Sequence, residues 1–266
     1  MATTGISKVD LRGLEPGGPG WEEARAAVTA SVEALGAVLV AHGALGPDLR
    51  QALFGRAAPE FFALPPDAKR RLVSGPVHGY IGPRPKAPAY ESARVWEAAA
   101  DGGVVRSAAD IIDGLELQAK DGTWLAVPAD EPDTIAVVAG ELLTVVTNGK
   151  VPASVHRVRT PSDRERFSAQ FESRPKYGSS VRPLEELVGE GHPLQYTPCN
   201  FDEYVDFRFI GDGRKLTDPL KGFCGVAKDE NLMAVNRRLF DSKVGLKRRW
   251  MLVSVVLLYR TLCLQL

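Results

Sequence analysis

The chain has 266 residues, enough for one large β-rich domain or two small ones. Apolar residues make up 44% and charged residues 25%, a balance that supports a sizeable core and argues against a disordered chain. Lys and Arg together number 33, as do Asp and Glu, so no net charge points to nucleic acid, and we expect no nucleic-acid partner.

Cysteine usage and the N-terminus bear on the compartment. Cys199, Cys224 and Cys263 stand far apart without the spacing of a metal site, and their odd number argues against a disulfide framework. They are typical of free thiols in a reducing compartment. The first five residues have neither the basic start nor the apolar run of a signal peptide. We therefore predict a cytoplasmic protein.

The first 95 residues are predicted to form an α/β N-terminal region. A helix begins at Trp21, carries an apolar face and ends at Gly36, and a second helix opens at Pro47 and is kinked or divided by Pro59. The other elements expected here are strands at 9–11 and 37–41, a short helix at 65–69 and a loop over 75–88.

After residue 113 the sequence changes to short β-branched runs. The predicted strands are Gly114–Gln118, Thr123–Val127, Thr134–Val138, Leu142–Thr147, Ala153–Arg159 and Phe167–Phe171. Asp121-Gly122 and Asn148-Gly149 are hairpin turn signals between them. Short strands at this spacing predict part of a β-sandwich or jelly roll.

The C-terminal tail, residues 227–266, differs again. Basic residues 247–249 precede an apolar run from Trp250 to Tyr259, about half of the roughly 20 residues that a membrane span needs. A core strand or an appended stretch is the favoured interpretation, with a tail anchor over 250–266 as the alternative. We do not expect a membrane partner.

One group of polar residues is arranged for chemistry. His156 lies late in a predicted strand, and Arg166 and Ser168 follow a turn at 161–165. Residues two apart in a strand face the same side, so Arg166 and Ser168 point together, and a hairpin can bring His156 onto that face. The imidazole would ligate a metal, while the guanidinium and hydroxyl would hold the far carboxylate of a metal-bound dicarboxylic acid.

This pattern resembles the plant iron(II)- and 2-oxoglutarate-dependent dioxygenase family. The likeness extends over roughly residues 6–95 and 112–226, and includes Gly114-Leu115-Glu116-Leu117, Thr147-Asn148-Gly149-Lys150 and Asn200-Phe201-Asp202-Glu203-Tyr204. It implies a mainly β fold with flanking helices, an incomplete double-stranded β-helix (jelly roll) preceded by the α/β region. It also implies Fe(II) and 2-oxoglutarate as cofactors, with His156 as the distal iron ligand and Arg166 and Ser168 binding 2-oxoglutarate.

The chain departs from the family at the iron site. Family members bind iron through two His and one carboxylate, and the first His and the carboxylate form a His-x-Asp pair. The residues two after His42, His78, His156 and His192 are Ala44, Tyr80, Val158 and Leu194, so no such pair exists. Asp110 and Asp113 lack an upstream His and are not expected to be ligands, and the other three histidines are typical of packed or surface residues. We therefore place a missing family segment at a junction, residues 96–113, between the N-terminal region (1–95) and the second half of the jelly roll with its C-terminal helices (114–226).

Two functions follow from the resemblance and the departure. The complete relative would hydroxylate, desaturate or demethylate a small plant metabolite, but this chain, as a shortened product, is expected to be catalytically inactive. The alternative is a non-catalytic remnant or interaction protein from an alternative transcript or imperfect gene model, with self-association through strand edges that missing neighbours leave exposed. The expected ligand class in either case is a small-molecule metabolite.

Overall fold

The computed structural model describes residues 5–43, 46–71, 79–83, 90–94, 114–128, 133–159, 167–169, 175, 178–226, 256–257 and 262–263. The chain divides into two compact units. Unit 1 comprises Met1–Val138, Ser154–Glu172 and Val256–Leu266, and unit 2 comprises Ala139–Ala153 and Ser173–Val255. The predicted junction at 96–113 and most of the predicted tail lie outside the described residues.

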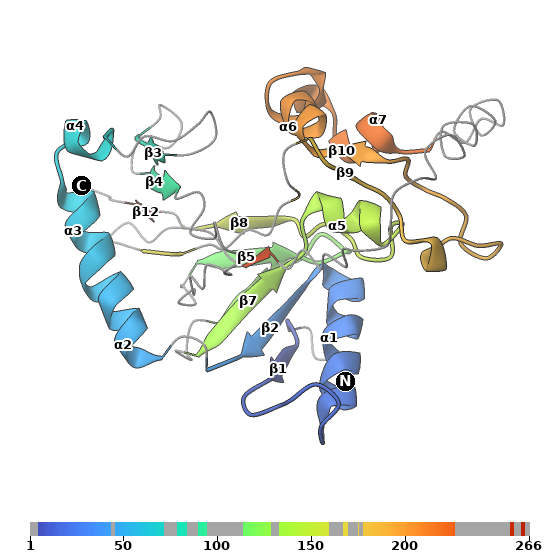
Figure 1. The fold of residues 1–266 in the computed structure, drawn as a ribbon, viewed down its shortest axis with the longest axis horizontal. Helices are drawn as coiled ribbons and strands as arrows, with labels where there is room; N and C mark the ends of the chain where they lie inside the picture. The colour runs from blue at the N-terminus through green and yellow to red at the C-terminus, as the bar shows by residue number, and fades with distance from the viewer. Residues whose placement is uncertain are drawn as a thin grey trace. The chain divides into compact units, whose positions relative to one another are not determined.

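The described part of unit 1 contains three small sheets (Figure 1). The first has the order β1 (Lys8–Asp10), β2 (Ala37–Ala41), β7 (Thr134–Val138), β11 (Val256–Leu257). The second has the order β6 (Trp124–Ala126), β5 (Leu115–Gln118), β8 (His156–Val158), and the third β12 (Leu262–Cys263), β4 (Tyr90–Arg94), β3 (Gly79–Ile81). β2 pairs with β1 in parallel and with β7 antiparallel over five residues, from Ala37↔Val138 to Ala41↔Thr134. Strands far apart in the sequence therefore share one sheet.

The helices of unit 1 follow the predicted starts and stops. They are α1 (Trp21–Leu35), α2 (Pro47–Arg50), the π-helix η1 (Gln51–Ala57), α3 (Ala58–Ala63) and α4 (Pro66–Lys69). α1 ends where Gly36 adopts a left-handed φ of 70° and donates its N–H to the Val32 carbonyl, a conformation that glycine adopts readily. The π-helix gives way to α3 next to Pro59, which has no N–H to continue the ladder. The predicted division of this helix is thus confirmed.

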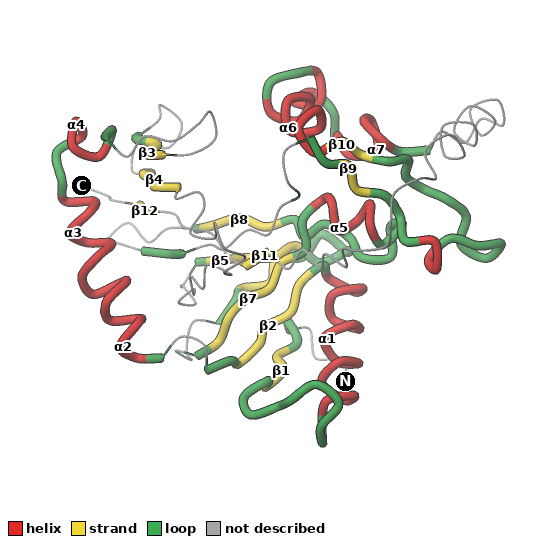
Figure 2. Tube along the Cα trace, in the orientation of Figure 1, coloured by secondary structure: helices red, strands yellow, loops and turns green. Residues whose placement is uncertain are grey.

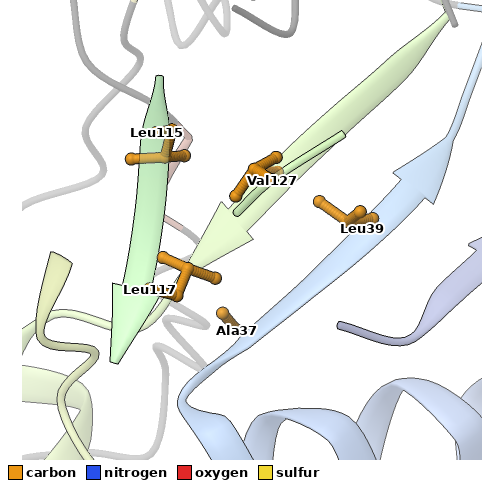
Figure 3. Packing of buried hydrophobic residues seen from close by; sticks show 6 residues of the cluster. Ala37, Leu39, Leu115, Leu117 and Val127 are labelled. Carbon is orange, nitrogen blue, oxygen red and sulfur yellow. The ribbon is translucent and has the colours of Figure 1, made fainter. Parts of the chain in front are cut away.

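The core of unit 1 lies on both faces of β2. Its alternating side chains put Leu39 against the β6–β5–β8 sheet and Val38 against α1. Figure 3 shows Leu39 and Ala37 facing Leu115, Leu117 and Val127. Two sheets packed face to face with a helix on the outer side are what a sandwich or jelly roll requires.

The predicted hairpin at 114–127 is confirmed. β5 and β6 pair antiparallel with Gln118↔Trp124 in register, and Gly122 takes a left-handed φ of 87° in the turn. The Asp121 carboxylate accepts from the Thr123 N–H at 2.9 Å, the Asx contact that favours Asp in turns. The turn residues therefore account for the point at which the chain reverses.

Unit 2 is held mainly by helices and turns (Figure 2). Its elements are α5 (Glu141–Val146), β9 (Ser180–Val181), the 3₁₀ turn η2 (Glu185–Leu187), β10 (Cys199–Asn200), α6 (Phe201–Phe209), the 3₁₀ turn η3 (Asp212–Lys215) and α7 (Pro219–Cys224). Asn200 caps α6 by accepting from the N–H groups of Asp202 and Glu203. The core of this unit gathers Val145, Tyr196, Cys199, Tyr204, Leu220 and Cys224.

Two of the predicted strands, Leu142–Thr147 and Phe167–Phe171, are not strands where the structure describes them. Leu142–Thr147 forms α5 instead of a strand, because Leu142 and Val145 then lie on one helical face and pack into the core of unit 2. Packing has overridden the β propensity of a Thr-Val-Val run. Asn148-Gly149 consequently ends a helix instead of joining two strands, with the Gly149 N–H donating to the Thr144 carbonyl at 2.8 Å. The described part of the predicted strand Phe167–Phe171, residues 167–169, carries no strand.

The apolar tail contributes two short strands where it is described. Val256–Leu257 pairs antiparallel with β7 and Leu262–Cys263 with β4, in keeping with the core-strand interpretation of this stretch. Among the residues that the structure describes, no helix is both long and apolar enough to cross a membrane.

Candidate functional site

His156 begins β8, which is hydrogen-bonded to β5. Its cross-strand neighbour is Leu117, and Val158 stands opposite Leu115. Directly opposed residues project from the same face of a sheet, and Leu115 and Leu117 are buried in the core, so His156 projects toward the sheet-on-sheet interior. The sequence predicted that His156 shares one face with Arg166 and Ser168, and the strand pairing gives the direction of His156 alone.

Burial and a hydrogen bond to Ser154 both act on the His156 imidazole. Nδ1 lies 3.0 Å from the Ser154 carbonyl oxygen. Burial lowers the pKa of the ring below its ordinary value of 6.5, and the contact with Ser154 opposes this only in part. In the neutral tautomer in which Nδ1–H donates to this carbonyl, the lone pair lies on Nε2. A neutral imidazole oriented through its other nitrogen is the form in which histidine binds metals.

The other two predicted site residues are described unequally. Ser168 is buried, with 3% of its surface exposed, and belongs to unit 1 as His156 does. The preceding Phe167 packs against a cluster that contains Phe61, Phe62 and Tyr80. Arg166, which was predicted to bind the 2-oxoglutarate carboxylate, lies outside the described residues, as does the turn before it.

The opposite face of the β6–β5–β8 sheet carries charge. The Arg157 guanidinium hydrogen-bonds the Glu116 carboxylate, and Arg159 Nε lies 3.2 Å from the same carboxylate. The Arg157 guanidinium carbon is 3.9 Å from the centre of the Trp124 ring, a cation–π stacking distance. These side-chain contacts add to the backbone pairing of β8 with β5, in which His156 lies opposite the buried Leu117. Strict alternation along β8 was the sequence signal for this face.

The ligand set for iron is incomplete in the described part of the chain. No group of three or more His, Cys, Asp or Glu side chains could hold a metal ion there. His192 belongs to unit 2, where its Nε2 contacts the Asn148 carbonyl oxygen at 2.9 Å, and His42 follows β2. His78, Asp110 and Asp113 lie outside the described residues. The donors described therefore do not fit an Fe(II) site of two His and one carboxylate.

A buried polar network lies in the same unit and has no counterpart in the sequence predictions. Lys69 and Glu91 are both largely buried, with Nζ 2.7 Å from Oε1, and Lys69 Nζ also donates to the Phe62 carbonyl at 3.0 Å. The Tyr80 hydroxyl donates to the same Glu91 oxygen, and burial followed by this hydrogen bond raises the pKa of Tyr80 to about 12. The sequence did not predict this ion pair, because Lys69 and Glu91 are 22 residues apart and no local pattern links them.

The chain is similar in sequence to known oxygenases over part of its length. The family model of the 2OG-Fe(II) oxygenase superfamily matches residues 87–175. The 2-oxoglutarate-dependent dioxygenase AOP3 of Arabidopsis thaliana is 40% identical over 118 residues, which is 44% of this chain and 28% of AOP3. The probable inactive 2-oxoglutarate-dependent dioxygenase AOP2 of the same plant is 35% identical over 118 residues, 44% of this chain and 29% of that protein. The chain thus spans less than a third of the length of these curated relatives.

Solved structures confirm the predicted fold class. The rice dioxygenase for auxin oxidation superposes with a TM-score of 0.57 at 19% identity, covering 82% of this chain and 99% of that one. JOX2, crystallised with 2OG, Fe and JA, gives a TM-score of 0.61 at 18% identity, covering 83% of this chain and 89% of JOX2. The fold is the jelly roll of these oxygenases, and Fe(II) and 2-oxoglutarate are the cofactors of the family, as the sequence resemblance implied. In sequence, residues 87–175 resemble the 2OG-Fe(II) oxygenase superfamily, and 118 residues of the chain are similar to plant 2-oxoglutarate-dependent dioxygenases.

Proposed function

We propose that this chain is a catalytically incomplete relative of the plant Fe(II)- and 2-oxoglutarate-dependent dioxygenases. With its present sequence, it does not oxidise a substrate. The observation that carries this proposal is His156 itself. It faces the interior of its sheet pair and its Nδ1 contacts the Ser154 carbonyl, while the sequence offers no His-x-Asp or His-x-Glu pair to complete a family iron site. One imidazole holds a hard divalent cation far more weakly than an assembled triad does.

We further propose that the complete relative of this chain hydroxylates, desaturates or demethylates a small plant metabolite. The dioxygenase for auxin oxidation and the JOX2 complex with JA support small organic molecules as the ligand class. The missing His-x-Asp segment would lie at 96–113, between residues 1–95 and 114–226. A transcript that encodes a longer version of this protein is therefore expected to carry the pair at this junction.

An anaerobic titration tests the proposal directly. The purified chain is titrated with Fe(II) in the presence of 2-oxoglutarate, and the metal-to-ligand charge-transfer absorbance of the ternary complex is followed, with full-length AOP3 as a positive control. We expect the band with AOP3 and no band with this chain. Release of succinate from 2-oxoglutarate in air is measured on the same samples, and none above the metal-free blank is expected.

Matched variants would identify the iron ligands if a band did appear. The residues to change are His156→Ala, Ser168→Ala and Arg166→Met, each compared with the unchanged chain. A charge-transfer band that appears in the unchanged chain and disappears in His156→Ala would overturn the proposal, because it would require ligands outside the family pattern. Asp110 and Asp113 would then be substituted first.

Self-association is the alternative function. In the described part of the chain, β6 and β8 are the outer strands of their sheet, which supports pairing of one of these edges with a second copy. Sedimentation velocity over a range of protein concentrations tests this, and a constant monomer mass would rule it out. The cytoplasmic location stays a prediction for cell fractionation to check.

A further inference from the structure

Two buried thiols meet in the core of unit 2. Cys199 lies in β10 and is fully buried, and Cys224 is the last residue of α7 with 2% of its surface exposed. Neither is bonded to another cysteine in the structure, and both belong to the apolar cluster with Val145, Tyr204 and Leu220. They are separated by 24 intervening residues, so only the fold of unit 2 brings them together.

The backbone holds the two segments against each other. The Thr197 N–H donates to the Cys224 carbonyl at 2.8 Å, and the Thr197 hydroxyl donates to the same oxygen at 3.2 Å. The next residues outward, Tyr196 and Gly225, form an antiparallel bridge. The segment that leads into Cys199 is therefore fastened to the end of α7 by direct hydrogen bonds.

The two thiol side chains lie within hydrogen-bonding reach of each other. The side-chain hydrogen bond between the two thiols is the largest influence on Cys199, and together with burial it raises the pKa of Cys199 far above its ordinary value. Each thiol also faces a local carbonyl, Cys199 Sγ at 3.8 Å from the Asn200 oxygen and Cys224 Sγ at 3.5 Å from the Leu220 oxygen. Two thiols that neighbour each other on separate elements are the arrangement from which a disulfide can form.

We propose that Cys199 and Cys224 are a redox-sensitive pair that closes into a disulfide between β10 and α7. With oxidised glutathione as the oxidant, one cysteine thiolate attacks the glutathione disulfide, breaks its S–S bond and releases one glutathione thiol. The second cysteine then attacks the mixed disulfide and releases the second glutathione. The protein loses two protons and two electrons, and glutathione is reduced to two thiols.

Burial determines how this pair behaves. A buried, protonated thiol is a poor nucleophile, so exchange proceeds when α7 transiently separates from β10, and the rate of oxidation follows that opening. The closed disulfide would then fasten α7 to the strand and stabilise unit 2 by restricting its unfolded chain. This inference is independent of the proposed function, because it concerns neither His156 nor any cofactor.

Cys263 provides the matched control. It is the third cysteine of the chain and lies in β12 of unit 1, so Cys263→Ser removes competing pairings and leaves unit 2 unchanged. The full chain and the Cys263→Ser, Cys199→Ser and Cys224→Ser variants are equilibrated with oxidised glutathione, and free thiols are alkylated in denaturant. Intact mass and peptide mapping then locate the bonds. Circular dichroism checks that each variant is folded.

We expect Cys263→Ser to lose both remaining thiols, to yield one cross-linked peptide pair containing Cys199 and Cys224, and to melt several degrees higher than its reduced form. A dithiol reductant should reverse these changes. Three outcomes would each overturn the proposal. They are two thiols that persist at equilibrium, glutathione adducts in place of the internal bond, and a bond that includes Cys263 in the unchanged chain. The unchanged chain decides the question even if a serine variant fails to fold.

Discussion

Asn148 connects the end of α5 to the loop that passes over it. Replacing Asn148 tests how much its side-chain hydrogen bonds stabilise unit 2. The side chain is fully buried and the residue adopts a left-handed φ of 50°. Its Nδ2 donates to the carbonyls of Leu187 at 3.2 Å and Pro193 at 3.1 Å, and its Oδ1 accepts from the Gln195 N–H at 2.8 Å. A single amide thus satisfies three backbone groups of one loop.

The expected loss follows from these contacts. Asn148→Ala removes three hydrogen bonds worth about 1 kcal/mol each in net free energy of unfolding. Alanine in the left-handed region costs roughly 1 kcal/mol more, so the total is about 4 kcal/mol. Asn148→Gly loses the same hydrogen bonds without the conformational cost, and about 3 kcal/mol is expected. Asn148→Asp keeps the acceptor but turns a carboxylate toward two carbonyls, so it should be no milder than alanine.

Urea unfolding followed by circular dichroism measures these losses, and hydrogen exchange at the Gln195 amide localises them. We expect the order of stability unchanged chain, Gly, Ala, with about 1 kcal/mol between the last two. Equal midpoints for Ala and Gly would refute the role assigned to the backbone conformation. A loss below about 1 kcal/mol in both, with Gln195 still protected, would refute the role assigned to the amide.

Three further predictions concern unit 1. Gly114→Ala is expected to be severely destabilising, because the φ of Gly114 is 100° and a Cβ there would lie 1.9 Å from a backbone oxygen. Gly122→Ala is the control: its φ is 87° but the space around it is open, so it should cost only about 1 kcal/mol in denaturant unfolding. Lys69→Met, which leaves the Glu91 carboxylate buried without its cation, should cost about 3–5 kcal/mol; the double variant Lys69→Met/Glu91→Leu should recover part of this, and equal losses would contradict the pairing. His156 should titrate below its ordinary pKa of 6.5 when its ring signals are followed by NMR. Because the folded protein then binds fewer protons than the unfolded chain, stability is lost as pH falls from about 6.5 through the folded pKa, and His156→Gln should remove that component.

Much of unit 1 could be predicted because its signals are local. Gly36 ends α1, Pro59 divides the second helix, and Asp121-Gly122 forms a hairpin, since each depends on the conformations open to one or two residues. The inward direction of His156 likewise follows from the two-residue period of a strand. The resemblance that rested on these elements was confirmed by the family and fold comparisons.

The wrong prediction in unit 2 shows where local signals fail. The run Leu142–Thr147 has the composition of a strand, yet it forms α5 because Leu142 and Val145 must share one face to reach the core around Tyr196 and Tyr204. Asn148 then ends a helix instead of turning a hairpin. Helix and strand propensities differ by less free energy than the burial of apolar side chains contributes. The core surface against which this segment packs therefore decided that it forms a helix.

The sequence by itself determined the resemblance to the plant 2-oxoglutarate-dependent dioxygenases, the jelly-roll class, the placement of His156 on a strand and the lack of a His-x-Asp pair. Only the tertiary structure decided that Lys69 pairs with Glu91 in a buried network, that Asn148 satisfies a distant loop, and that Cys199 meets Cys224. The physical reason is the same in each case. Motifs and turns are encoded in neighbouring residues, whereas contacts between residues far apart in the chain depend on which surfaces are buried together when the strands and helices pack.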